Sequence, residues 1–200
     1  MTDPKNILSV LHLVRSGLAS GLLNKEEVID WVDKIITKDK EPDIFFIDIS
    51  LSRNKNDMVH YIGDYLNFEN PEIQGKPLLR LLYKQYITRQ INLEQTVSRL
   101  FRLKFEAVFT AREESYIYSL DNEYDCAVNN IYGTLEDVEI ELNKFLGFYR
   151  DYSIDSFEKW QEFDFTVESE IDKDIEMQQE EDKLIKSLNI VDEKPWWKFC

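Results

Sequence analysis

The chain is poor in the residues that cross-linked, metal-binding or turn-rich proteins need. Its 200 residues include only 2 cysteines, 2 histidines, 6 glycines and 5 prolines. The cysteines, Cys126 and Cys200, are too few for a disulfide framework, which predicts free thiols and a reducing, cytoplasmic location. So few glycines and prolines argue against an all-β protein, because its tight turns require them.

Catalytic and membrane signals are also missing. No apolar stretch approaches the roughly 20 residues that cross a bilayer, so we expect no membrane association. The first residues lack the pattern of a secretory signal. We expect His12 in the core and His60 at the surface, and neither stands in a metal-ligand spacing. There is no Gly-rich phosphate loop and no nucleophile elbow, so we predict no enzyme, no catalytic residues, no cofactor and no metal.

What the chain does contain is aromatic and aliphatic side chains at helical spacing. Hydrophobic residues make up 43% of the sequence, with 12 Phe, 10 Tyr and 4 Trp, which favours a folded protein. The segment DIFFIDISLS (43–52) also fits a strand, but no partner strand is evident, and we interpret it as helical. We therefore predict an all-α fold with helices over 7–20, 24–36, 43–52, 57–68, 78–89, 93–105, 111–131, 134–150 and 154–163.

Capping residues predict where several of these helices begin. Asn24 and Asn92 are good N-caps. Thr134 followed by Asp137 resembles a capping box, with Asp in place of Glu or Gln. The helix after Thr134 would bury one apolar stripe, formed by Leu135, Val138, Leu142, Phe145, Leu146 and Tyr149.

An internal repeat emerges when the chain is shifted by 68–69 residues against itself. LLNKEEVIDWV (22–32) then lies over QINLEQTVSRL (90–100), and VHYIGDYL (59–66) lies over VNNIYGTL (128–135). Two interpretations stay open, since amphipathic helices resemble one another at many offsets. We predict that residues 1–200 form a single helical domain, and if the duplication is real this domain is an array of two multi-helix units. These units would span 7–68 and 75–135, with C-terminal helices over 134–190.

Negative charge is in excess and unevenly distributed. The 39 acidic and 24 basic residues give a net charge of −15. By successive fifties of residues the net charge is −3, +2, −5 and −9. Because DNA and RNA affinity comes largely from neutralising phosphates, this charge disfavours nucleic-acid binding. A basic protein is the partner that such a surface fits.

The acidic segment after Phe163 allows two accounts. It carries like-charged pairs at i,i+4, such as Glu168–Asp172 and Asp172–Glu176, each of which opposes a helix slightly. The segment is either a marginal solvated helix or a surface that docks on a basic partner, which would relieve the repulsion.

One part of the chain resembles a known class of proteins. GLLNKEEVIDWVDKII (21–36) followed by PDIFFIDISLS (42–52) is similar to the N-terminal part of small helical immunity proteins from bacterial polymorphic-toxin and contact-dependent growth inhibition systems. The resemblance implies a cytoplasmic, non-enzymatic protein that binds a cognate toxin domain and blocks it. Many such toxins are basic nucleases.

Together these observations lead to one preferred hypothesis and two alternatives. The preferred hypothesis is an immunity protein that occludes the active site of a basic toxin domain, a nuclease. The alternatives are a helical interaction scaffold without a toxin partner and an enzyme whose carboxylates bind a divalent metal. For the first hypothesis the predicted partner-binding residues are Glu136, Asp137, Glu139, Glu141, Glu168, Asp172 and Glu176.

Overall fold

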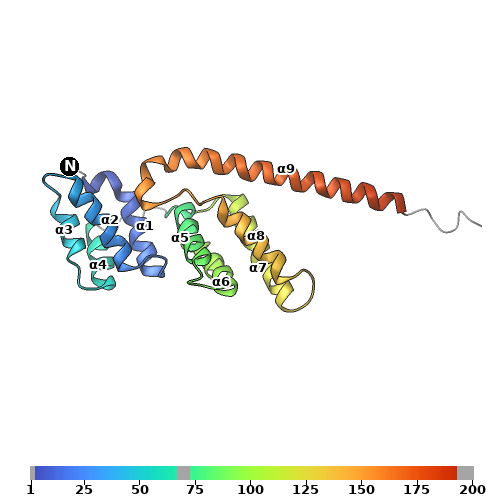
Figure 1. The fold of residues 1–200 in the computed structure, drawn as a ribbon, viewed down its shortest axis with the longest axis horizontal. Coiled ribbons are helices and arrows are strands. Elements are labelled where there is room, and N and C mark those ends of the chain that lie inside the picture. The colour runs from blue at the N-terminus through green and yellow to red at the C-terminus, as the bar shows by residue number, and fades with distance from the viewer. Residues whose placement is uncertain (1–2, 67–72, 193–200) are drawn as a thin grey trace, which may run out of the picture. The chain divides into compact units, whose positions relative to one another are not determined.

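The computed structural model describes residues 3–66 and 73–192, with side chains described at only some positions after 177. Within these ranges the chain is all-α, and no strand is formed. The helices, shown in Figure 1, are η1 (Pro4–Ile7), α1 (Leu8–Ser20), α2 (Lys25–Lys38), α3 (Ile44–Ser50), α4 (Lys55–Tyr65), α5 (Gly75–Ile87), α6 (Leu93–Leu103), α7 (Ala111–Val128), α8 (Leu135–Gly147), η2 (Ile154–Lys159) and α9 (Trp160–Asp192).

The chain divides into two compact units, Met1–Glu158 and Lys159–Cys200. The first unit contains α1–α8, so the C-terminal helices expected over 134–190 are shared between the two units. The second unit contains α9. Among the described residues no helix is both long and apolar enough to span a bilayer.

Side-chain caps begin α2, α6 and α8, as the sequence predicts, whereas α1 and α5 begin without one. Complete capping boxes begin α2 at Asn24, α6 at Asn92 and α8 at Thr134, where the Asp137 side chain accepts from the Thr134 backbone N–H. A fourth capping box, at Thr110, begins α7. The ambiguous segment at 43–52 is indeed helical as α3, and Asp43 caps it.

The prediction of a short helix over 154–163 is wrong. Residues 154–159 form the 3-10 helix η2, and α9 begins at Trp160 and continues to Asp192. The Ser153 and Ser156 side chains bond each other and nearby backbone groups, which competes with α-helical hydrogen bonding. Ser156 has non-helical backbone angles as a result.

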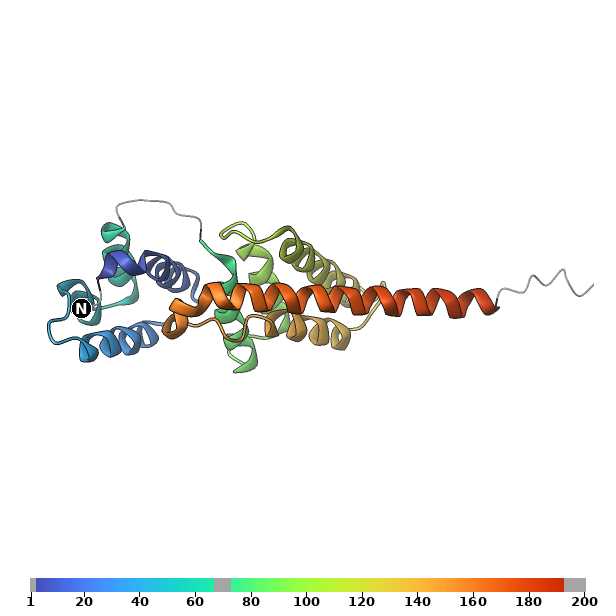
Figure 2. The same cartoon turned by 90° about the horizontal axis from the view of Figure 1, so that it is seen from above.

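The helices of the first unit fall into two groups of four, α1–α4 and α5–α8, which lie side by side in Figures 1 and 2. In the first group α1 packs on α4 and α2 on α3. In the second group α5 likewise packs on α8 and α6 on α7, but α7 also packs extensively on α8 and α5 on α6. Contacts between α1 and α5, and an ion pair from Lys84 to Glu27, join the groups.

The helix order can be compared with the overlay that suggested the repeat, which stays a prediction. The overlay of 22–32 on 90–100 places α6 over α2, and the same shift of 68 residues places α5 over α1. Residues 128–135, which the sequence overlay matched to α4, instead form the turn before α8. The mismatch arises because α7 has 18 residues where α3 has 7. The second group therefore ends with α8 at Gly147, beyond the expected boundary at 135.

A buried hydrogen bond closes the base of the pair formed by α7 and α8. Glu113, in the first turn of α7, is 1% exposed, and Tyr149, just after α8, is fully buried. The Tyr149 hydroxyl donates to Glu113 Oε1 at 2.9 Å, while the Thr110 backbone N–H donates to Oε2 at 2.8 Å. Burial and then the Glu113 charge raise the pKa of Tyr149 well above its ordinary value, so the hydroxyl stays protonated.

A close contact at the start of α5 explains why residue 75 is a glycine. The Gly75 N–H donates to the carbonyl oxygen of Val108 at 3.0 Å, which draws the start of α5 against the loop before α7. A Cβ at Gly75 would overlap the ring of Phe109, which is itself buried.

We expect Gly75→Ala to lower the free energy of unfolding by about 1–3 kcal/mol, because the Phe109 ring would have to move. Urea unfolding followed by circular dichroism measures the change. Gly147→Ala is the matched control, since the nearest atom to its Cβ is the Tyr83 oxygen at 3.9 Å. The control should be neutral or slightly stabilising, and equal effects at the two positions would contradict the packing argument.

We expect Tyr149→Phe to destabilise the protein by about 1.5–3 kcal/mol, because the buried Glu113 carboxylate would lose a donor. Tyr124→Phe, also on α7, is the control, since that hydroxyl has no hydrogen bond within the described ranges. Unfolding midpoints of the two variants in urea give the comparison. If Tyr149→Phe lowers the free energy of unfolding no more than Tyr124→Phe does, this hydrogen bond contributes little to stability.

Candidate functional site

The strongest surface feature of the first unit is the end of the α7–α8 pair. Residues 121–141 hold seven carboxylates and no lysine, arginine or histidine. All seven side chains are exposed or half-buried. We call them the acidic flanks: Asp121, Glu123 and Asp125 on α7, and Glu136, Asp137, Glu139 and Glu141 on α8.

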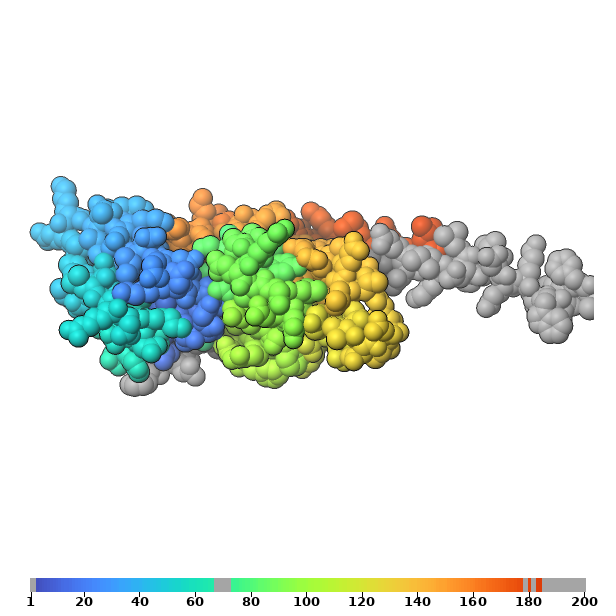
Figure 3. All heavy atoms as spheres, turned by 60° about the horizontal axis from the view of Figure 1, so that its bottom comes forward, coloured from blue at the N-terminus to red at the C-terminus, as the bar shows by residue number. Residues whose placement is uncertain are grey.

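Apolar side chains stand at the turn between these flanks. Four of them are between 46% and 68% exposed, and we call them the apolar tip: Val128, Ile131, Tyr132 and Leu135. The flanking carboxylates lie within about two helical turns of the tip along the chain, a distance of roughly 11 Å. In Figure 3 the yellow atoms of this region lie at the surface of the first unit.

Hydrogen bonds hold the turn in one conformation. Asn130 and Gly133 both have positive φ angles, of 54° and 70°. The Ile131 N–H donates to the carbonyl oxygen of Cys126 at 2.9 Å, and the Asn122 side chain donates to the Tyr132 hydroxyl at 2.9 Å. The pKa of Tyr132 is raised, first by its hydrogen bond with the Cys126 thiol and then by burial. The turn therefore presents its apolar side chains in a defined arrangement.

The four carboxylates predicted as partner contacts on α8 differ in whether they already have hydrogen-bond partners within the chain. Asp137 is engaged in the capping box with Thr134. Glu139 accepts a hydrogen bond from the Tyr86 hydroxyl at 2.8 Å, and burial and this bond raise the pKa of Tyr86. Within the described part of the chain, Glu136 and Glu141 have no hydrogen-bond or ion-pair partner, so they are the carboxylates most available to another molecule.

The other three predicted residues, Glu168, Asp172 and Glu176, lie on α9 in the second unit, and all are exposed. The acidic segment after Phe163 is thus helical, as one continuous helix. Glu168 and Asp172 take part in interactions within the chain. The two predicted sets therefore belong to different units.

The prediction that Leu135 is buried is wrong. The helical stripe after Thr134 predicts a buried Leu135, whereas its side chain is 46% exposed. The other members of the stripe, from Val138 to Tyr149, are buried as predicted. The reasoning from sequence also missed Val128, Ile131 and Tyr132. The available signal was the pair Ile131–Tyr132 in a turn bounded by asparagines and glycine, where polar residues are usual.

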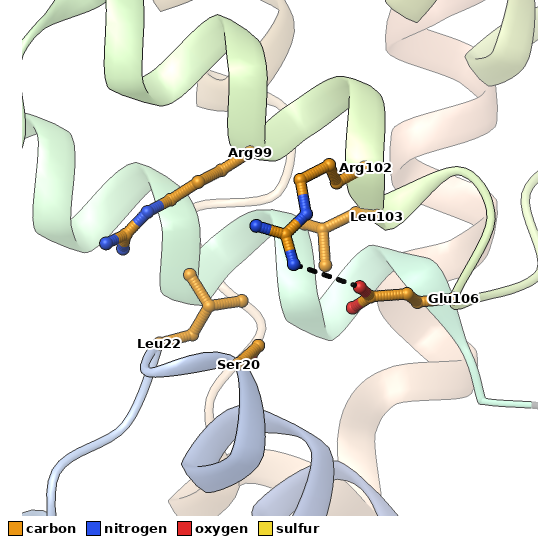
Figure 4. A pocket seen from close by; sticks show the side chains of 6 residues that line it. All are labelled: Ser20, Leu22, Arg99, Arg102, Leu103 and Glu106. Atoms are coloured by element: carbon orange, nitrogen blue, oxygen red, sulfur yellow. Dashed lines mark ion pairs between the residues drawn. The ribbon is translucent and has the colours of Figure 1, made fainter.

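Two hollows border α6. A groove of about 700 Å³ is lined by the α5–α6 connection and by Glu139 and Asn143 of α8. A smaller pocket, of about 110 Å³, is lined by Arg99 and Arg102 (Figure 4). Both arginines already have partners, because Arg99 donates to Gln85 Oε1 at 2.6 Å and Arg102 lies 3.9 Å from Glu106.

The two histidines and the two cysteines lie in different surroundings. His12 is buried and His60 is exposed, as predicted. Cys126 is a free, buried thiol beneath the turn, and Cys200 lies outside the described residues. Over the described residues, no group of three or more His, Cys, Asp or Glu side chains is arranged to hold a metal ion.

No protein-family model, curated protein or solved structure matches this chain. The interpretation of the α7–α8 end therefore rests on its own charge, exposure and hydrogen bonding.

The pKa of one carboxyl in the acidic flanks is raised, which predicts a pH-dependent effect on stability. Burial and then the nearby Asp125 carboxylate raise the pKa of Asp121 above its ordinary 3.8. A carboxyl whose pKa is higher in the folded state costs stability when it is ionised. This cost is complete above the folded-state pKa and disappears as the pH falls to 3.8.

We therefore expect Asp121→Asn to stabilise the protein at pH 7 by up to about 0.5 kcal/mol, a small gain because the site is screened by solvent. The gain should vanish as the pH is lowered below 3.8. Thermal unfolding between pH 3 and pH 7 measures it, with Asp64→Asn on α4 as the control. A gain that persists at low pH would show that charge is not its cause.

Proposed function

We propose that this chain is an immunity protein that binds and neutralises a basic toxin domain, a nuclease, through the α7–α8 end of its first unit. The observation that carries the proposal is the run of seven carboxylates without a cation over residues 121–141, on an exposed surface. The resemblance of residues 21–52 to helical immunity proteins supports the same conclusion.

The chemistry follows from charge. A nuclease binds the phosphates of its substrate with lysine and arginine side chains, so its cleft is positively charged. The carboxylates of the acidic flanks would occupy that cleft in place of phosphates. Long-range attraction between the two surfaces would also speed their encounter.

The contact residues in this proposal are the predicted set on α8, with Glu136 and Glu141 most available because they have no partner among the described residues. Asp137 and Glu139 contribute charge while they hold the turn and the Tyr86 hydroxyl. Glu168, Asp172 and Glu176 on α9 stay a prediction as partner contacts, since they belong to the second unit.

Growth protection tests the proposal directly. The toxin domain encoded beside the gene for this chain would be expressed in a bacterial host, with and without this protein. We expect growth to stop without the protein and to resume with it, and nuclease activity of the purified domain to fall on addition of the protein. The absence of an adjacent toxin gene, or toxicity that the protein does not relieve, would overturn the proposal.

Association kinetics with the same purified toxin domain test the role of charge. We expect Glu136→Gln/Glu141→Gln to slow association by about 3–10-fold at low salt, with the difference disappearing at high salt. The matched control is Glu26→Gln/Asp30→Asn, which removes two exposed carboxylates from α2. If the two double variants associate at the same rate, steering by the acidic flanks is ruled out.

A further inference from the structure

The apolar tip is an unusual surface for a turn. Its four side chains are about half exposed or more, although turn residues are normally polar. Exposed apolar side chains that gather at one place, with polar groups around them, mark interaction sites more often than single exposed residues do. The acidic flanks supply that polar surround on both helices.

The apolar tip has a defined conformation in the absence of a partner. Both left-handed residues, Asn130 and Gly133, are placed where asparagine and glycine tolerate a positive φ. The backbone of the turn is bonded to the last turn of α7, and Asn122 fixes the Tyr132 hydroxyl. A rigid apolar surface loses little conformational entropy on binding, so more of its burial appears as affinity.

Charge decides which surface can cover the tip. A second copy of this chain docked tip to tip would bring seven carboxylates against seven, which is strongly unfavourable. An apolar partner surface with an acidic rim would meet the same repulsion. The complementary surface is an apolar pocket with lysine and arginine at its rim.

We propose that the apolar tip seats in such a pocket of the partner and sets the lifetime of the complex, while the acidic flanks, which occupy the phosphate-binding cleft, set the rate of encounter. This division of roles rests on the proposed function for the identity of the partner. Ile131, Tyr132 and Leu135 are the anchors, since they are the large apolar side chains of the turn and of the first turn of α8.

Dissociation kinetics with the purified toxin domain encoded beside the gene test this proposal. We expect Ile131→Ala/Leu135→Ala to raise the dissociation rate by at least about tenfold and to change the association rate by less than about threefold. Tyr132→Ala should act in the same direction. Circular dichroism and urea unfolding of each variant verify that the fold is retained.

The matched control is Ile44→Ala/Leu51→Ala, which truncates two apolar side chains at α3 that are 66% and 74% exposed. The control should dissociate at the wild-type rate. Wild-type dissociation by the tip variants would overturn the anchor proposal alone, whereas failure of the unaltered protein to bind the toxin domain would overturn the proposed function and this inference with it.

Sedimentation of the isolated protein tests whether a second copy of the chain covers the apolar tip. We expect the same monomeric mass for the wild-type chain and for the tip variants. Self-association that Ile131→Ala/Leu135→Ala abolishes would assign the tip to a second copy of the chain and would overturn the proposal.

Discussion

The hydrogen bond from Tyr149 to Glu113 is the interaction on which the candidate surface depends. It joins the first turn of α7 to the residue just beyond α8, so it closes the pair of helices at the end opposite the turn. Because both groups are buried, neither can exchange this bond for one to water. The apolar tip and the acidic flanks keep their relative positions because the helices that carry them are closed in this way.

The same helix pair combines a stable base with a repulsive end. Near the base, both oxygens of the Glu113 carboxylate accept a hydrogen bond, one from Tyr149 and one from Thr110. Near the tip, residues 121–141 hold seven carboxylates and no lysine, arginine or histidine, and burial and then repulsion from the Asp125 carboxylate raise the pKa of Asp121. Such repulsion lowers the stability of the free protein and would be relieved by a basic partner. Burial of the apolar tip against the partner would slow dissociation of the complex, whereas the charge would speed its association.

Sequence reasoning succeeded where the decisive forces are local. Asn24, Asn92 and Thr134 cap helices as predicted, because a cap bonds backbone groups only two or three residues away. The ambiguous DIFFIDISLS segment was also assigned correctly, from the helical character of its neighbours. Reasoning failed for 154–163, where competing serine hydrogen bonds delay the start of the long helix to Trp160.

By itself the sequence determined the all-α class, most helix starts and the concentration of negative charge in the second hundred residues. These properties follow from helical periodicity, local capping and composition. Only the tertiary structure decided that Leu135 leaves its apolar stripe and joins Ile131 and Tyr132 at the surface. The reason is geometric, because Leu135 follows the spacing of the buried stripe but is the first residue of α8, where 46% of its side chain stays exposed.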